Sequence, residues 1–516
     1  MLQSTDNSVL EAEDNSFWSI LREAVAGSSR DFTKGSIGLA IFLLAVPMIL
    51  EMLMESIFAL VDIFFVAHRG AESVAVVVLT ESILALVYAI AIGLSIGAGA
   101  TVARRIGEKD EEGAAKSAVH AIFLGVGVSV LISIVGIIFA PQILNVLGGS
   151  PQVVEEGTMF MRIMLGSNAV IIFLFVLNSI FRGAGDAAIA MRVLLLANAL
   201  NIVLAPCFVY GPGIFAFLGI DAPQWLVDNW IFPELGVTGA AVGTTIGRGA
   251  GAAFAAWRLF RPGGRITIRG EHWKIDTGLL KSLVKIAAPG ILQFTIATAS
   301  WSVLVSIVAR FGDAALAGYG VGLRVIMFAL LPAVGLANAA ATLVGQNLGA
   351  GNPERAEKSV WKAAYINAAF LGAVGLILLF FSNGIVEFFT NEADVVAYGR
   401  DTLHIVAYGF VFYGFGMVLE TAFNGAGDTW TPTYLNFFVF WLFEIPLAFI
   451  LANGLTWVGV INDYLPSRIG FLDEIAKIQF NFGAQGVFWA ITIAFSVLAV
   501  ASAVLFKRGK WKEKKV

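Results

Sequence analysis

The sequence predicts an all-α integral membrane protein with twelve transmembrane helices, arranged as two parallel repeats of six. Of its 516 residues, 58% are hydrophobic and 14% are charged, and the mean hydropathy is +0.82. Soluble globular proteins of this size are far less apolar. Apolar stretches of the length needed to cross a bilayer recur along the whole chain. The two halves also resemble each other in sequence.

The first apolar run follows an acidic tail instead of a basic one, so we expect this span to be retained and not cleaved as a signal peptide. Each span needs about 20 residues to cross the hydrocarbon. The predicted spans are residues 36–66, 73–103, 117–140, 152–181, 187–211, 235–257, 278–309, 314–346, 359–381, 394–423, 430–453 and 483–506.

The placement of basic residues predicts the orientation of the chain. Most of the 33 lysine and arginine residues lie in the two tails and in the connections that follow even-numbered spans. Because basic residues accumulate on the cytoplasmic side, both termini are predicted to be cytoplasmic in a multi-pass protein of the inner (cytoplasmic) membrane. The net charge of −4 says little about orientation, because the asymmetry of basic residues lies in particular connections and not in the total charge.

Several function classes are excluded by what the sequence lacks. It contains no GxxxxGK[ST] phosphate loop and no paired Cys/His metal spacing, and its single cysteine, Cys207, lies in an apolar run. We therefore expect neither enzymatic activity nor ATP hydrolysis, no resident cofactor and no nucleic-acid partner. The energy for any transport must come from another source.

An internal repeat supports the division into halves. "FRGAGDAA" from Phe181 returns as "FNGAGDTW" from Phe423, 242 residues later, and the same offset pairs Pro47 in "AVPMIL" with Pro289 in "AAPGIL". Since six spans is an even number, both halves enter the membrane in the same sense, as in secondary transporters that hold substrate between their repeats. The predicted domains are a tail 1–35 with an interfacial helix, a lobe 36–257, a linker 258–277, a lobe 278–507 and a basic tail 508–516.

The repeated GAGD segments are predicted to be structural turns, in preference to ligand sites. Two glycines permit a tight turn at the cytoplasmic end of each half, and the aspartate that follows can cap the next helix. The residues are Gly183, Gly185 and Asp186 in the first half and Gly425, Gly427 and Asp428 in the second.

Three acidic residues of the first span indicate an ion site. Glu51, Glu55 and Asp62 share one stripe of a helix, and the default interpretation of acids inside a span is functional. Clustered carboxylates repel one another and resist ionisation, which suits a site for a proton, a sodium ion or a cationic substrate. The second half has Gln293, Ala297 and Leu304 at these positions, so the acidic site belongs to the N-terminal lobe. Alternatively, Asp62 faces lipid headgroups.

Other in-span residues are weaker candidates. Glu444 lies near mid-span, whereas Glu420 lies close to the cytoplasmic end. Glu81 and Arg324 occupy nearly equivalent positions, and they form either an interlobe pair that breaks during transport or a structural buried pair. Pro47 and Pro289 are expected to kink their helices.

The sequence resembles the MATE (multidrug and toxic compound extrusion) transporters, prokaryotic type, of the multidrug/oligosaccharidyl-lipid/polysaccharide flippase superfamily. The segments that carry this resemblance are "DFTKGSIG", "VDIFFVAHRG", "RGAGD", "NGAGDTWTP" and "FPELGVTGAAVGT". The resemblance implies a V-shaped, monomeric pair of six-helix lobes that exports organic cations or amphipathic drugs in exchange for H⁺ or Na⁺.

The resemblance also implies a cation site in the N-terminal lobe. Asp62 matches the aspartate of the first helix, and Asn201 matches the Asn of an Asn-x-x-x-Asp motif, but Ala205 stands where the second Asp is expected. This departure leaves Glu51 or Glu55 to supply the missing carboxylate. Further candidate ligands are Thr244 and Asn198.

A flippase for a lipid-linked saccharide or peptidoglycan precursor is the alternative function. Such cargo is anionic, and a cavity for it should favour arginines. The in-span acids outnumber the in-span arginines Arg162, Arg248 and Arg324, so cationic cargo fits better. A passive channel or scaffold explains the repeat less well.

Overall fold

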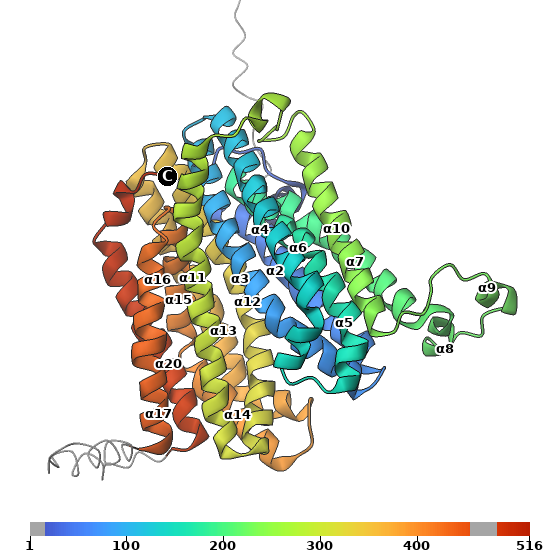
Figure 1. Cartoon of the computed structure of the whole chain (residues 1–516). Helices are drawn as coiled ribbons and strands as arrows, with labels where there is room; N and C mark the ends of the chain where they lie inside the picture. Colours follow the sequence, from blue (N-terminus) through green and yellow to red (C-terminus); the bar gives the residue numbers. More distant parts are fainter. Residues whose placement is uncertain (1–15, 455–481) are drawn as a thin grey trace, which may run out of the picture.

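The computed structural model describes residues 16–454 and 482–516, without the side chains of residues 58–60, 62, 63 and 71. The described residues form helices and their connections, with no strand among them (Figure 1). The first half holds α1 (Phe17–Ala26), α2 (Ile37–Ala67), α3 (Ala71–Gly107), α4 (Glu111–Val146), α5 (Pro151–Gly166), α6 (Asn168–Ala184), α7 (Ala187–Tyr210), α8 (Ile214–Phe217), α9 (Gln224–Asp228) and α10 (Val237–Phe260).

The second half repeats this order. It holds α11 (Thr277–Val308), α12 (Asp313–Gly349), α13 (Pro353–Glu387), α14 (Ala393–Ala407), α15 (Phe410–Gly425), α16 (Trp430–Asn436), the π-helical segment η4 (Phe437–Glu444), α17 (Ile445–Asn453), α20 (Ala484–Lys507) and the short helix η5 (Lys510–Glu513).

The helices agree closely with the predicted spans. Ten of the described helices are long and apolar enough to cross a membrane, and the pair α14 and α15, bent by 59°, makes an eleventh. The remaining predicted span, 235–257, is also a helix, α10. It is less apolar than the others because its sequence is rich in glycine and threonine and contains Arg248.

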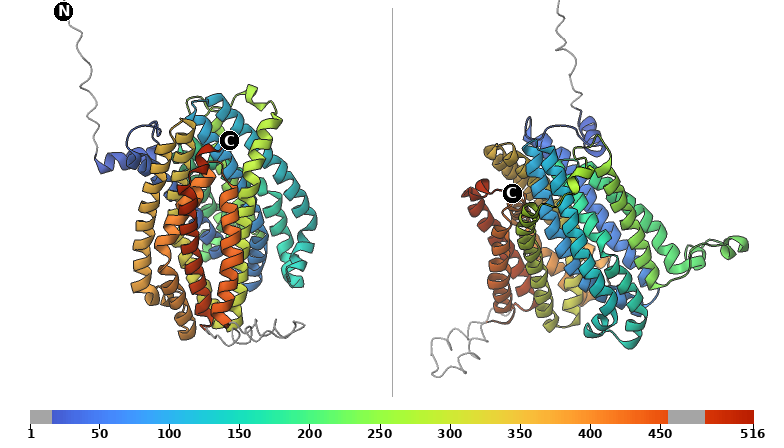
Figure 2. Two further views of the ribbon diagram at one scale, coloured as in Figure 1. Left: turned by 90° about the vertical axis from the view of Figure 1, so that its left-hand side faces the viewer. Right: turned by 45° about the horizontal axis from the view of Figure 1, so that its top comes forward.

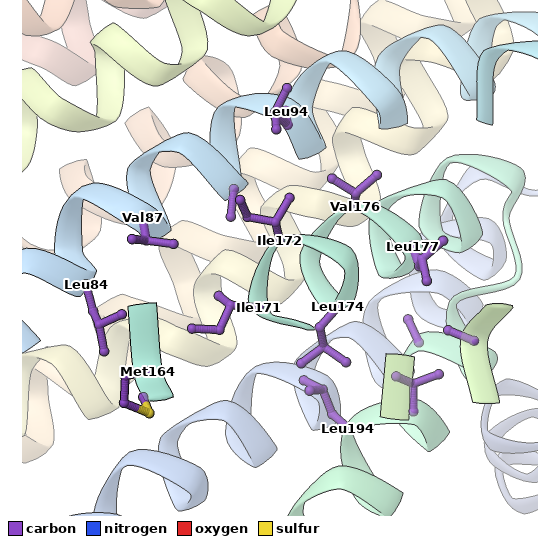
Figure 3. Close-up of a cluster of buried hydrophobic side chains, with 14 of the residues drawn as sticks. Leu84, Val87, Leu94, Met164, Ile171, Ile172, Leu174, Val176, Leu177 and Leu194 are labelled. Carbon is purple, nitrogen blue, oxygen red and sulfur yellow. The ribbon is translucent and has the colours of Figure 1, made fainter. Parts of the chain in front are cut away.

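Each half has its own apolar core. In the N-terminal lobe, side chains of α3, α5, α6 and α7 interlock, as Figure 3 shows for Leu84, Met164, Ile171 and Leu194. A second core joins α11, α12, α13, α14, α15 and α20 in the C-terminal lobe. Figure 1 shows the two lobes diverging toward one end, which gives the V shape expected from the resemblance.

The opposite end of the bundle is where α1 and the C-terminal segment lie, and we call it the terminal face (Figure 2). Here the lobes touch through reciprocal glycine contacts. A Cβ built on Gly107 would collide with the carbonyl of Gln346, and one built on Gly349 would collide with the carbonyl of Arg104. These residues are 242 positions apart in each case, so the contact obeys the internal repeat.

A second reciprocal contact lies deeper along the same helices. Gly93 packs against Ile291, and Gly335 packs against the backbone of Ile49, again with an offset of 242 residues. The absence of a side chain at each glycine lets the helices approach closely. The lobes are therefore held together by α3 against α11 and α12 against α2.

The helices α2 and α11 each contribute to both lobes. Leu44 and Met48, early in α2, belong to a third apolar cluster with residues of α12 and α13, whereas Val66, near its end, belongs to the N-terminal core. Conversely, Ala287 of α11 belongs to the N-terminal core and Leu304 to the C-terminal one. Pro47 and Pro289 lie where these changes occur, inside helices that continue through them.

The C-terminal segment packs on the terminal face. Trp511 is fully buried and stacks on Phe506 at 4.5 Å between ring centroids. Lys514 forms an ion pair with Asp428 of the C-terminal lobe at 3.1 Å. Its carbonyl accepts a 2.6 Å hydrogen bond from Arg104 of the N-terminal lobe. This segment therefore contacts both lobes.

Candidate transport cavity and ion site

A cavity of about 590 Å³ lies between the lobes. The reciprocal contacts of Gly107 and Gly349 close it on the side of the terminal face, because the lining residues lie earlier on the same two helices. Large apolar side chains dominate its wall, and they come from both lobes: Met52, Phe175, Phe294, Trp301, Met327, Tyr413 and Met417. Both lobes contribute uncharged polar groups, whereas the charged lining residues come from the N-terminal lobe.

Glu51 is one of these charged residues, and it is already paired. Its side chain is 1% exposed, and its Oε1 accepts hydrogen bonds from Arg182 Nη1 at 2.5 Å and from Asn178 Nδ2 at 3.2 Å. α6 carries both donors, so the pair joins α2 to α6. A buried carboxylate with such partners keeps its charge without the full cost of an isolated ion.

Glu55, one turn later, has a separate partner. Its Oε1 accepts a 3.2 Å bond from Arg248 Nη2 on α10, and Arg248 Nη1 also donates to the Tyr88 hydroxyl at 2.8 Å. A second cavity, of about 470 Å³, is lined by Glu55, Glu81, Tyr88, Thr244 and Arg248. Glu55 lines both cavities and thus connects them.

The stripe of acids therefore differs in one respect from the sequence-based interpretation. Glu51 and Glu55 were expected to repel each other as clustered carboxylates, whereas each has its own arginine. Arg182 directly follows the predicted span 152–181, and the sequence alone indicates no partner for Arg248. One signal could have found both pairs. The second half lacks the acids, with Gln293 and Ala297, and at the same offset it has Asn424 in place of Arg182. Near the ends of the halves the offset becomes 247 residues, as between Gly236 and Gly483, and there Phe495 stands in place of Arg248.

The remaining candidate ligands lie deeper in the N-terminal lobe. Asn201 Nδ2 donates to Thr244 Oγ1 at 3.1 Å, which brings α7 and α10 together. Asn198 donates to the carbonyl of Met54 at 3.0 Å, and Ala205 is fully buried. Asp62 lies on α2, but its side chain is outside the described residues.

Two other candidates stand apart. Glu81 and Arg324 are both exposed, and the described part of the structure contains no ion pair between them, so the predicted pair is absent in this conformation. Glu444 is buried in the C-terminal lobe, far along the chain from the acids of α2. Among the described residues, no group of three or more His, Cys, Asp or Glu side chains could hold a metal ion.

Both GAGD segments form turns, but the two glycines of each segment have different roles. Gly185 and Gly427 have φ of +82° and +81°, as tight turns require. Gly183 and Gly425 instead allow close helix packing, since an added Cβ would clash with the carbonyl of Gly99 or Ala341, which are equivalent positions in the two halves.

The predicted capping by the aspartates is wrong. Asp186 occupies the position before α7, but its side chain makes no capping hydrogen bond. Burial raises the pKa of Asp186, and the nearby positive charge of Arg265 opposes this shift. Asp428 accepts a 2.8 Å hydrogen bond from Thr431 and pairs with Lys514. Both aspartates thus serve tertiary contacts at the terminal face.

Comparison with known proteins gives consistent results. The family model MatE matches residues 47–207 and 289–450, once in each lobe. The probable multidrug resistance protein NorM of Thermotoga maritima is 24% identical over 436 residues, which cover 82% of this chain and 88% of that protein. The multidrug export protein MepA of Staphylococcus aureus is 23% identical over 476 residues, which cover 92% and 94% of the two chains.

Among solved structures, one described as the outward-facing conformation of a multidrug resistance MATE family transporter is similar over nearly its whole length. The TM-score is 0.79 at 25% identity, and the match covers 94% of this chain and 98% of that chain.

Proposed function

Because this chain belongs to the MATE family, we propose that it is a secondary active antiporter that exports organic cations or other amphipathic drugs in exchange for H⁺ or Na⁺. The family consists of membrane transporters and not enzymes, and the relatives are named as multidrug resistance or export proteins. Multidrug efflux is thus the general activity, and the coupling ion and its acidic site are the proposed refinements.

The central cavity is the observation that carries the proposal. Its volume of about 590 Å³ lies within the 300–1,000 Å³ typical of pockets for drug-sized ligands. Its aromatic and methionine side chains can adapt to apolar molecules of different shapes. The charged residues that line it are Glu51, Glu55 and Arg182, so its wall has one more negative than positive charge, which favours a cationic ligand.

The proposed coupling uses competition for these carboxylates. A cationic substrate in the cavity approaches Glu55, which is 22% exposed and faces both cavities. We propose that the coupling ion binds near Glu55, Asn201 and Thr244, with Asp62 as a further ligand. A proton or Na⁺ bound there would weaken the attraction of the carboxylates for the substrate, and the substrate would be released. Exchange then requires that the lobes alternately close at the two ends of the cavity.

We further propose that the terminal face is cytoplasmic and that the protein acts as a monomer in the inner membrane. The distribution of basic residues supports this orientation. In that case the conformation described here is closed to the cytoplasm and faces outward.

Transport in proteoliposomes tests the proposal. The purified protein would be reconstituted and given tetraphenylphosphonium, an organic cation, under an imposed proton gradient or an imposed sodium gradient. We expect one gradient to drive transport in the wild type, and we expect Glu55→Gln and Asp62→Asn to abolish it. Glu156→Gln, which changes an exposed glutamate of the same lobe, is the matched control and should transport normally.

A folded wild type that transports nothing under either gradient would contradict antiport. It would favour the second candidate, a flippase for a lipid-linked saccharide or peptidoglycan precursor. Arg182 and Arg248 give that candidate some support, because arginines recognise anionic groups. However, each arginine is already paired with a glutamate, so neither offers a free positive charge to the cavity.

A further inference from the structure

We propose that Glu444 is a proton-binding site in the C-terminal lobe and that it exchanges its proton with the central cavity by way of Tyr413. Its contribution to coupling rests on the proposed antiport, whereas the site itself does not. The site is separate from the acids of α2, which lie in the other lobe.

Glu444 is the most isolated carboxyl group of the described structure. Its side chain is 1% exposed, and neither Oε1 nor Oε2 has a hydrogen-bond partner. No described lysine, arginine or histidine forms an ion pair with it. An unpaired carboxylate charge is costly in such surroundings, so the neutral acid, which carries a proton, is the form that fits.

The local backbone around Glu444 is unusual. It ends the π-helical segment η4, an eight-residue stretch of a helix type that is rare and is frequently found at functional sites. The segment contacts α11, α16, α17 and α20, so the carboxyl group is enclosed by several helices.

Two titratable groups lie close enough to Glu444 to interact with its charge, and both are phenols. Tyr319 of α12 is 1% exposed, its hydroxyl has no hydrogen-bond partner, and it lies within electrostatic range of Glu444. Tyr413 of α15 lies within electrostatic range of both Glu444 and Glu420. Glu444 is buried, and no positive charge on a described residue nearby offsets the cost of ionising its carboxyl group.

Tyr413 connects this region with the substrate cavity. It lines the central cavity and also a small cavity of about 20 Å³ that Tyr319 lines as well. That volume can hold about one water molecule. Two phenol groups and one water can form a short hydrogen-bonded chain, because each can both donate and accept.

A proton fits this site better than a metal ion does. A cation such as Ca²⁺ or Mg²⁺ needs about six oxygen ligands. The described residues here offer the carboxyl group of Glu444 and two phenols, Tyr319 and Tyr413, and the one-water cavity that both phenols line has no described carboxyl group in its wall. A proton needs only one carboxyl oxygen.

Infrared spectroscopy of the reconstituted full-length protein tests the site directly. We expect the wild type at neutral pH to show a carboxylic acid C=O stretching band that Glu444→Gln lacks. Glutamine has nearly the shape of the neutral acid, so this variant should fold. Glu387→Gln, which changes an exposed glutamate of the same lobe, should keep the band, and Glu420→Gln should keep the Glu444 component.

The route through Tyr413 has its own test. After transfer to D₂O the band shifts as the carboxyl proton exchanges, and we expect Tyr413→Phe to slow this shift by roughly a hundredfold, the lower end of what a positioned proton-transfer group contributes. An unchanged rate would overturn the route.

A band that Glu444→Gln leaves unchanged in intensity, or that disappears only in Glu420→Gln, would overturn the site. These measurements require no transport. A wild type that fails to transport while the band behaves as expected would therefore refute antiport and leave the proton site standing. Conversely, gradient-driven transport together with a band that Glu444→Gln leaves unchanged would support antiport and refute the proton site at Glu444.

Discussion

Replacing Gly349 with alanine should weaken the contact between the lobes at the terminal face. The new Cβ would lie 3.0 Å from the carbonyl carbon of Arg104 and from the nitrogen of Glu108, and closer still to the Arg104 carbonyl oxygen. These are backbone atoms of a helix, which cannot rotate away. Overpacking of this kind costs typically about 1–3 kcal/mol.

This cost falls only on the conformation in which the lobes touch. The gain in helix propensity from glycine to alanine applies to both conformations and cancels between them. A difference of about 1–3 kcal/mol changes the ratio of the two conformations by roughly 5- to 150-fold. The ratio of the conformation that is open at the terminal face to the closed one should rise by that factor.

Pulsed electron paramagnetic resonance can measure the shift in lipid nanodiscs. Glu112 and Glu354 are exposed residues at equivalent positions of the two halves, and spin labels on cysteines there report the separation of the lobes. Cys207, the single native cysteine, is buried and would be replaced by serine. We expect Gly349→Ala to add a population with a longer interlabel distance.

Gly127→Ala is the matched control, because a Cβ there has no atom within 4 Å. It should leave the distance distribution unchanged. If Gly349→Ala gave the same distribution as the wild type, the reciprocal glycine contact would not determine closure, and our reasoning would be refuted.

Three further predictions follow from contacts described above. Arg182→Gln leaves Glu51 buried without its ion pair and should lower the free energy of unfolding by about 3–5 kcal/mol, measured by thermal unfolding in detergent; adding Glu51→Gln should restore much of the loss. Trp511→Ala should cost about 3–5 kcal/mol and expose the C-terminal segment to carboxypeptidase. Asp428→Ala releases Lys514 and should lower stability while ion coupling persists in proteoliposomes, since a loss of coupling in a well-folded variant would contradict a structural role.

Most of the fold was predictable, because a bilayer tolerates few alternatives. Unsatisfied backbone groups are too costly in hydrocarbon, so long apolar stretches must become helices. The offset of 242 residues then related the halves, and the packing of Gly107 and Gly349 obeys it. What the hydropathy pattern missed was the bend between α14 and α15.

The candidate site was less predictable. The periodicity of α2 placed Glu51 and Glu55 on one stripe, but their arginines lie 131 and 193 positions away along the chain. Helical periodicity relates only neighbouring turns, so it is blind to such partners. Only a comparison of the two halves indicates these ion pairs, because the second half lacks both the acids and the arginines.

The capping role of Asp186 failed for a related reason. A Gly-Asp sequence before a helix is a local signal, and local signals give way when a tertiary contact offers more. The side chain of Asp186 lies near Arg265, a residue of the connection between the lobes. Similarly, Tyr413 and Tyr319 had no recognisable pattern, since single tyrosines are common in apolar helices.

α2 and α11 each pack in both lobes, and this arrangement affects how the protein folds during its synthesis. Ribosomal synthesis delivers the N-terminal half first, and domains usually fold as units in that order. The beginning of α2, with Leu44 and Met48, packs in a cluster to which α12 and α13 contribute many residues, and these partners are made only later. Until then it presents an unmatched apolar stripe to lipid or to the insertion machinery. Nascent chains arrested before α12 should therefore remain associated with that machinery, although all six predicted spans of the first half are already present.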